Sequence, residues 1–210
     1  MSDTRTKLLD AAADIVREQG AAGASARAIA ARAGVNQALV FYHFETVRKL
    51  IDAACRRAVD EAAGRYREQL AAVTSLVGLL DVGRELHRQE RDAGNVALMA
   101  QLMSGAGRDP VLAEAARYAM DVWVGEIEPV VERALHDSPL AAAIDTVGLA
   151  RAVSASFLGL ELYEGVDPQG AASALDAVQL LGVLVEVVDD LGPLVRLALR
   201  AKLRSLRSGA

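Results

Sequence analysis

The sequence predicts an all-α protein, and three observations support this prediction. Apolar residues recur every three or four positions and give a helix one face for a core, as in Leu8, Leu9, Ala12, Ile15 and Val16. No segment alternates apolar and polar residues for long, as a half-buried strand would. The five prolines lie near expected helix ends. With 210 residues, 52% of them hydrophobic, the chain can bury a large helical core.

Start and stop signals divide the first seventy residues into four helices. The first spans about 5–19 and ends at Gly20, and Ser25 caps the second. Gly34 ends the second helix, and Asn36 caps the third. Thr46 caps a fourth helix that runs to about residue 70, with an inner face of Leu50, Ile51, Ala54, Ala58 and Ala62.

Six more helices are expected after residue 70. Their predicted ranges are 75–90, 95–104, 110–136, about 138–164, 171–190 and a last amphipathic helix after Pro193. Asp109-Pro110 and Asp167-Pro168 have a cap followed by proline, which is typical of helix starts. The pair Gly105 and Gly107 is interpreted as a loop, not a phosphate cradle, because no strand precedes it and no lysine follows.

The second and third helices together have the pattern of a helix-turn-helix. Ala30 lies four residues before Gly34, so a small side chain lets the helices cross closely and the glycine can adopt the left-handed conformation. Buried contacts are expected from Ile29, Ala33, Val35 and Val40. Residues expected to point outward are Gln37, Ala38, Leu39, Tyr42 and His43. A generic helical hairpin is the alternative, but this outward set beside arginines favours DNA.

The same residues resemble a known family. Gly34-Val35, followed eight residues later by Tyr42-His43-Phe44, is similar to the TetR family of one-component transcriptional regulators. The motif covers about the first fifty residues, and the remainder agrees in length and helical layout. The resemblance implies a helix-turn-helix domain at 1–47, joined by the continuous fourth helix to a ligand-binding and dimerisation domain at 48–210.

Three positions depart from the family pattern. A lysine that clamps a DNA phosphate usually lies three residues after the position of Phe44, where this chain has Val47 followed by Arg48 and Lys49. Phe41 replaces the usual tyrosine, and Leu39 replaces a common threonine. Whether Arg48 or Lys49 takes over the clamp is left open, and the operator cannot be transferred from the family.

The charge is unevenly distributed along the chain. The formal net charge is −5, but residues 21–59 hold six basic and two acidic side chains, a local net charge of +4. Residues 71–210 hold 12 basic and 19 acidic side chains, a net charge of −7. A basic end on an acidic body can orient the protein toward phosphates, and ordinary fluctuation is the alternative explanation.

Nine residues are candidate contacts to double-stranded DNA: Ser25, Arg27, Asn36, Gln37, Ala38, Tyr42, His43, Arg48 and Lys49. Gln37 suits an adenine edge, whereas Tyr42 and His43 suit phosphate or sugar. Arg27 lies in the first turn of the second helix, whose amino terminus already favours phosphate. For Tyr42 and His43, packing in the core is the competing interpretation, and Asn36 fits a cap better than a base contact.

Two apolar regions of the larger part suggest binding partners. The helices 146–164 and 171–190 are apolar on nearly every side, so they are either central in their own fold or pressed against another subunit. The family resemblance implies a homodimer through these two helices. Candidates to line a pocket for a small, largely apolar ligand are Met99, Leu102, Met103, Tyr118, Trp123, Phe157 and Glu161. Each of them taken singly fits a helical core better.

Several function classes are not supported by the sequence. No Glu-x-x-His pair, His-x-x-x-His pair or nucleophile elbow occurs, so we expect no enzyme, no metal and no cofactor. No charge-free apolar stretch has the length of a membrane span, and residues 1–6 are too polar for a signal peptide. The single cysteine, Cys55, fits a reducing compartment, so a cytoplasmic protein is expected.

The resulting functional prediction is a sequence-specific, DNA-binding regulator. We expect a dimer that binds a palindromic operator and represses in response to a ligand. The alternative is a ligand-binding or protein-interaction module with weakened DNA contacts, suggested by Val47, Phe41 and Leu39. The ligand, the operator, the target genes and the choice between repression and activation cannot be read from the sequence.

Overall fold

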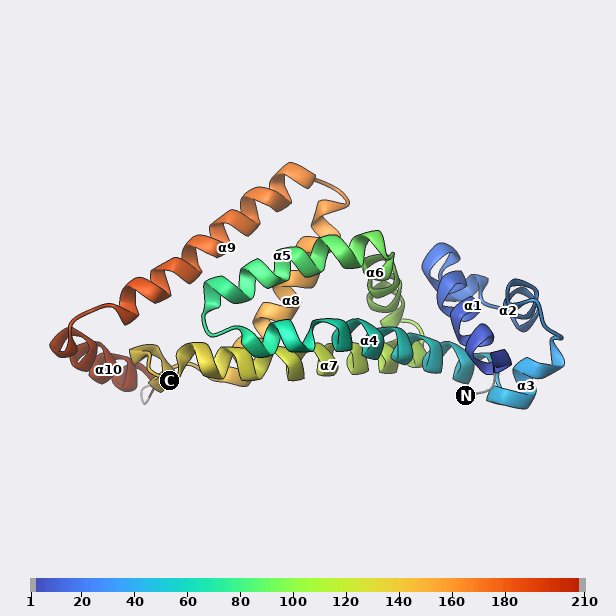
Figure 1. The fold of residues 1–210 in the computed structure, drawn as a ribbon, viewed down its shortest axis with the longest axis horizontal. Helices are drawn as coiled ribbons and strands as arrows, with labels where there is room; N and C mark the ends of the chain where they lie inside the picture. The colour runs from blue at the N-terminus through green and yellow to red at the C-terminus, as the bar shows by residue number, and fades with distance from the viewer. Residues whose placement is uncertain (1–2, 208–210) are drawn as a thin grey trace. The chain divides into compact units, whose positions relative to one another are not determined.

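A computed structural model describes residues 3–207, and within this range the chain folds into helices with no strand (Figure 1). The elements are α1 (Asp3–Gln19), η1 (Ala21–Gly23), α2 (Ala26–Ala33), α3 (Ala38–Phe44), α4 (Val47–Ala72), α5 (Leu76–Asp92), α6 (Asn95–Ala106), α7 (Pro110–Leu135), η2 (Pro139–Ala142), α8 (Thr146–Glu164), α9 (Pro168–Asp189) and α10 (Pro193–Arg207). The all-α prediction is confirmed.

Short polar side chains begin several of these helices, as the sequence predicts. Thr46 Oγ1 accepts a hydrogen bond from Lys49 N–H at 3.1 Å at the start of α4. Asp145 and Asp167 accept bonds from the backbone N–H groups of Gly148 and Gly170 at the starts of α8 and α9. Each side chain satisfies a donor that has no partner inside its own helix, so local sequence sets these helix starts.

Two details of the helix boundaries differ from the sequence prediction. Ser138 does not begin α8: it caps the separate 3₁₀ turn η2, and α8 begins later at Thr146, with Asp145 as its cap. Gly105 is not in a loop but inside α6. A Cβ at Gly105 would lie 2.2 Å from Leu112 Cδ1, so a larger residue there would require the buried Leu112 side chain to move.

Pro129 contradicts the expectation that every proline lies near a helix end, because it is inside α7, six residues before Leu135. Proline lacks the N–H that would bond to the carbonyl of Gly125, four residues earlier. Both residues are exposed, so water can satisfy this carbonyl and the helix continues.

The chain divides into two compact units. The first comprises Met1–Arg65 and Arg88–Val122, and the second comprises Tyr66–His87 and Trp123–Ala210. Helices α4, α5 and α7 contribute residues to both units. A functional boundary after residue 47 remains a prediction, because compactness does not test which residues bind DNA.

Each unit has its own hydrophobic core. In the first, the helix-turn-helix shares its core with α6 and α7: the fully buried Leu8, Ile29 and Val40 belong to the same cluster as Leu98 and Leu102. In the second, the core is built around Tyr66, Val130, Val131, Leu135 and Ala150. Helices α1 to α3, which we call the head, therefore pack against helices that lie far behind them in the sequence.

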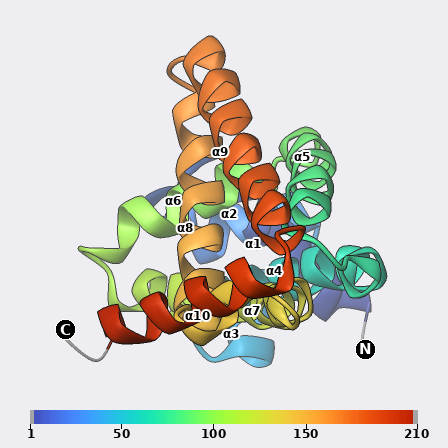
Figure 2. The same ribbon diagram turned by 90° about the vertical axis from the view of Figure 1, so that its left-hand side faces the viewer.

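In the second unit, α8 and α9 lie side by side (Figure 2). Only Ala171 and Gly182 are buried on α9, whereas Leu180, Leu181, Val183, Leu184 and Val187 are exposed. Among the described residues, α9 is also the one helix long and apolar enough to span a bilayer, with 11% of its apolar window buried. Apolar helices in soluble proteins can have the same length and hydropathy, so these two properties do not establish a membrane span.

Candidate DNA-binding site

A tight turn joins α2 to α3. Gly34 has φ 67° and ψ 33°, the left-handed conformation that glycine adopts without strain. Its N–H donates to the Ala31 carbonyl at 3.2 Å, and Val35 N–H donates to the Ala30 carbonyl at 3.0 Å. These bonds satisfy carbonyls at the end of α2 and direct the chain into α3. The predicted role of Gly34 is confirmed.

Two side chains fix the starts of the helices on either side of this turn. Ser25 Oγ accepts a hydrogen bond from Ala28 N–H at 3.2 Å and caps α2. Asn36 Oδ1 accepts from Ala38 N–H at 2.8 Å, just before α3. Asn36 therefore orders the start of α3, but the cap position predicted for it is occupied by Gln37, which makes no side-chain cap bond.

The inner side of α3 anchors it to the first unit. Val40 is fully buried and Phe44 nearly so, with the guanidinium carbon of Arg5 lying 5.0 Å from the centre of the Phe44 ring. Leu39 is half-buried against this core, so the expectation that it points outward is wrong. A leucine there gains more from burial than from exposure to water.

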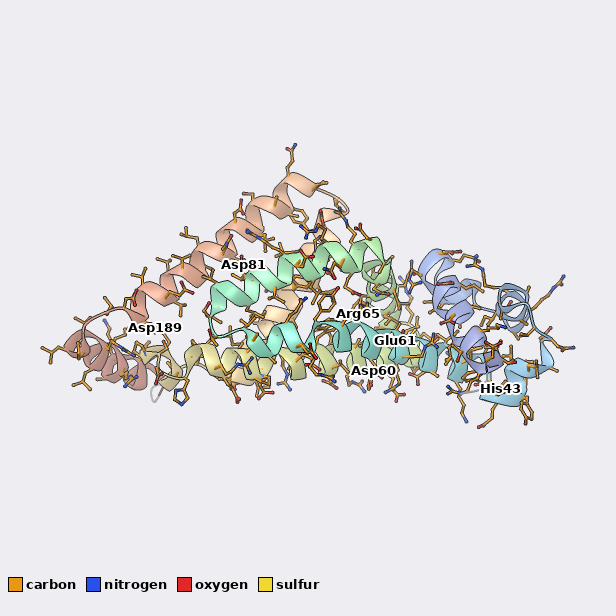
Figure 3. The ribbon with its side chains drawn as sticks, in the orientation of Figure 1. His43, Asp60, Glu61, Arg65, Asp81 and Asp189 are labelled. Carbon is orange, nitrogen blue, oxygen red and sulfur yellow. The ribbon has the colours of Figure 1, made fainter. Side chains whose placement is uncertain are left out.

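The outer side of α3 presents a mixed polar and aromatic surface. Gln37 and Ala38 are exposed, and 79% of Tyr42 is accessible to solvent, so Tyr42 does not pack in the core. His43, labelled in Figure 3, is partly exposed and meets the Tyr42 ring edge-on at a centroid distance of 5.0 Å. These side chains can reach a DNA groove and its sugar–phosphate edge without unfolding the helix.

Basic residues lie on both sides of this surface. Arg27 is exposed in the first turn of α2, and the amino terminus of a helix favours phosphate. Arg32, at the end of α2, donates two hydrogen bonds to Glu18 on α1, at 3.0 and 2.6 Å. The Arg32 guanidinium lowers the pKa of the Glu18 carboxyl. Of these two arginines, Arg27 is the better placed for DNA.

The two cations at the start of α4 are both held in ion pairs. Arg48 Nη2 lies 2.9 Å from Asp109 Oδ1, and Lys49 Nζ lies 2.6 Å from Glu45 Oε2. Val47, which occupies the usual lysine position, is half-buried against the core. Arg48 thus has a partner 61 residues away, which no local pattern in the sequence indicates.

The predicted ligand-pocket residues do not form one cluster. Leu102 is fully buried in the core of the first unit, with Met99 and Met103 packed against the same core. Tyr118 donates a hydrogen bond to Asp60 at 2.6 Å and lies against the Arg56 guanidinium. Trp123 and Phe157 pack against the core of the second unit. A pocket formed by these residues remains a prediction.

Glu161 lies in a polar cluster inside the second unit. Its Oε1 is 3.3 Å from His87 Nδ1, and Glu164 hydrogen-bonds the other ring nitrogen of His87. Phe157 meets the imidazole edge-on. The spacing of Glu161 and Glu164 places both on one face of α8, which is the signal that could have paired them. Because both glutamates lie more than 70 residues from His87 in the sequence, no local pattern indicates that they contact it.

Two chemical possibilities from the sequence analysis can be compared with the structure. Within residues 3–207, no group of three or more His, Cys, Asp or Glu side chains is arranged to hold a metal ion. Cys55 is buried, and burial raises the pKa of its thiol to about 12. A thiol that stays protonated and inaccessible is a poor nucleophile, so Cys55 fits a packing role.

Comparison with known proteins identifies the helix-turn-helix. Residues 8–54 match the model of "Bacterial regulatory proteins, tetR family". The chain is 35% identical over 71 residues to the HTH-type transcriptional repressor KstR2 of Rhodococcus jostii, covering 34% of this chain and 35% of KstR2. It is 27% identical over 110 residues to the regulator UidR of Escherichia coli, covering 52% of this chain and 55% of UidR. The chain thus spans between a third and just over a half of these relatives.

Solved structures resemble the whole fold. A transcriptional regulator from Rhodococcus sp. Rha1 has a TM-score of 0.64 at 24% identity, covering 91% of this chain and 100% of that one. The reduced form of Escherichia coli NemR has a TM-score of 0.72 at 17% identity, covering 84% and 96%. At these identities the likeness shows the fold alone. The two sequence relatives are named as a transcriptional repressor and a transcriptional regulator.

Proposed function

We propose that this chain, whose residues 8–54 match the tetR family model, is a DNA-binding transcriptional regulator that binds a palindromic operator as a homodimer and represses transcription until a small ligand releases it. The observation that carries the proposal is the exposed face of α3. Gln37 and Tyr42 are accessible there while Val40 anchors the helix from behind. A short helix held in this way can enter a major groove.

The homodimer is proposed through α8 and α9. The exposed leucines and valines of α9 form an apolar face, and water contact with such a face is unfavourable by roughly 25 cal/mol per Å². A second copy related by a two-fold axis would cover it with the same surface. The dimer also fits the DNA proposal, because one recognition helix reads only a half-site and a two-fold dimer reads an inverted repeat.

The proposed ligand response uses α4. Two residues separate this helix from the end of the recognition helix, and it continues without interruption to Ala72, so it can transmit a change in the helical bundle to the head. A small, largely apolar ligand would favour one geometry of the bundle and change the spacing of the half-sites. A coupling of about 1–3 kcal/mol is enough for such control. The cytoplasm, where bacterial DNA lies, is the proposed site of action.

Salt dependence of binding tests the DNA part of the proposal. At physiological salt, the affinity for a specific operator stays roughly 10³-fold or more above the affinity for a scrambled duplex. The alternative is a ligand-binding or protein-interaction module whose DNA contacts are weak. This alternative is favoured by the half-buried position of Val47 and by the ion pairs of Arg48 and Lys49. Such a module would bind all duplexes with similar affinity, and this affinity would fall as the salt concentration rises.

Adding candidate ligands to the protein–operator complex tests the regulatory part. A compound that binds the free protein and lowers operator affinity by about tenfold or more would support ligand-controlled repression. A compound that raises affinity would instead indicate a corepressor. Ligands that bind without changing DNA affinity would contradict the coupling through α4.

A further inference from the structure

Arg48 is held by the carboxylate of Asp109, which lies 61 residues away in the sequence, just before α7. Arg48 lies in the first turn of α4, directly after the recognition helix, and 62% of its side chain is exposed. Its guanidinium donates to Asp109 Oδ1 at 2.9 Å, and Asp109 immediately precedes α7. The pair therefore joins the start of α4 to the start of α7 within the first unit.

Asp109 has a fixed position of its own. The same Oδ1 atom accepts the backbone N–H of Val111 at 2.9 Å, so the carboxylate also caps α7. The bond from Arg48 and the bond from Val111 both lower the pKa of Asp109. The carboxylate is therefore ionised at neutral pH and is positioned by α7, not only by the arginine that it binds.

The neighbouring cation, Lys49, is paired within its own short segment. Lys49 pairs with Glu45 one turn away, and both side chains are more than 60% exposed. Exposed pairs of this kind in one short segment contribute little and exchange readily with other partners. Arg48 is the residue whose availability depends on another part of the fold.

We propose that Asp109 competes with a DNA phosphate for Arg48, so that the start of α7 restrains the affinity of the head for DNA. This inference rests on the proposed function. A carboxylate and a phosphate are alternative partners for a guanidinium, and the carboxylate also repels a phosphate that approaches the same group. A change that separates the starts of α4 and α7 frees Arg48 and adds one phosphate contact.

The test compares Asp109→Asn with wild type on a duplex enriched from a random pool. Asparagine caps a helix as well as aspartate does, so the substitution keeps α7 and removes the charge. We expect tighter binding and a plot of log K against log salt that is steeper by about 0.9, the value for one added phosphate. The gain in affinity is then about three- to fourfold larger at 50 mM than at 200 mM salt.

Glu114→Gln is the matched control. Glu114 also lies on α7 and pairs with an α4 arginine at 2.9 Å, but that arginine, Arg56, is two turns further from the recognition helix. The control changes the net charge by the same amount. We expect it to leave the salt slope unchanged, since Arg56 also pairs with Asp52 in its own helix.

An Arg48→Ala background separates competition from general charge. In the Arg48→Ala background, Asp109→Asn should raise DNA affinity no more than Glu114→Gln does. Competition for Arg48 would be contradicted if Asp109→Asn and Glu114→Gln raised DNA affinity equally in the wild-type background. It would also be contradicted if Asp109→Asn gave its full gain in affinity in the absence of Arg48. If wild type binds no duplex specifically, the proposed function itself fails. If wild type binds and Asp109→Asn changes nothing, only this inference fails. Circular dichroism checks that every variant is folded.

Discussion

Arg32 at the end of α2 and Glu18 on α1 form a two-bond ion pair that joins two helices of the head across fourteen residues of chain. The bond from Arg32 is the main reason that the pKa of Glu18 lies below its ordinary value. The planar guanidinium meets both carboxylate oxygens, which fixes the angle between the helices better than a single contact does. The position of the recognition unit on α1 depends in part on this pair.

Glu18→Gln should lower the thermal stability of the protein at neutral pH and not in acid. A carboxyl whose pKa is lower in the folded state stabilises that state above its unfolded pKa, near 4.3, and loses this effect as pH falls through the folded pKa. The melting temperature of the variant should therefore lie below that of wild type at pH 7, and the two should converge at about pH 3. An equal difference at both pH values would mean that the charge is not responsible.

Gly34→Ala should destabilise the protein by roughly 1–2 kcal/mol, because a side chain is strained at φ 67°. A Cβ there would meet no atom within 4 Å, so the cost comes from the backbone alone. Gly64→Ala is the control, since Gly64 is exposed inside α4 with equal free space. It should stabilise by about 0.5–1 kcal/mol. Urea unfolding measures both, and effects of the same sign would contradict the assigned conformation.

Gln37→Ala should weaken binding to the preferred duplex by about 1–3 kcal/mol and relax the preference at one base position. The exposed Gln37 side chain precedes α3, where it can reach a base edge. Arg27→Ala should instead weaken binding to all duplexes and reduce the salt slope by about 1. Fluorescence anisotropy with single-base variants separates the two patterns. If Gln37→Ala discriminated among the single-base variants as wild type does, Gln37 would not be a base-contacting residue.

Leu184→Glu should weaken the proposed dimer at least tenfold, or by about 1.4 kcal/mol, because a charge would be buried in the apolar α9 face. Leu184 is half exposed in the single chain. Leu197→Glu on α10, where the leucine is 66% exposed, is the control and should leave the dimer intact. Sedimentation velocity across a dilution series measures both. Dissociation by the control alone would place the interface on α10.

The features that sequence predicted well are local ones. Ser25, Gly34 and Thr46 each act within four residues of their own position, so their roles at helix ends follow from residue type and spacing. Gln37 and Tyr42 were expected outside, and Val40 inside, from helical periodicity alone.

The features that sequence missed depend on tertiary packing. Asp109 was recognised as a cap, but its bond to Arg48 joins residues 61 positions apart. Leu39 is half-buried because it packs against the core cluster of the first unit, which also contains residues of α6 and α7. Met99 and Phe157 were grouped by residue type, yet they pack against different cores. Pro129 remains inside α7 because its exposed face lets water replace the missing bond.

The most direct test of the central claim is selection of DNA duplexes from a random pool at physiological salt, with the wild-type protein. A two-fold dimer that presents α3 predicts enrichment of an inverted repeat whose half-sites lie about one helical turn apart, 10–10.5 base pairs, or a multiple of it. Enrichment that disappears in Gln37→Ala would tie the sequence preference to the recognition helix. A folded, dimeric protein that enriches no sequence would contradict operator binding and favour the interaction module.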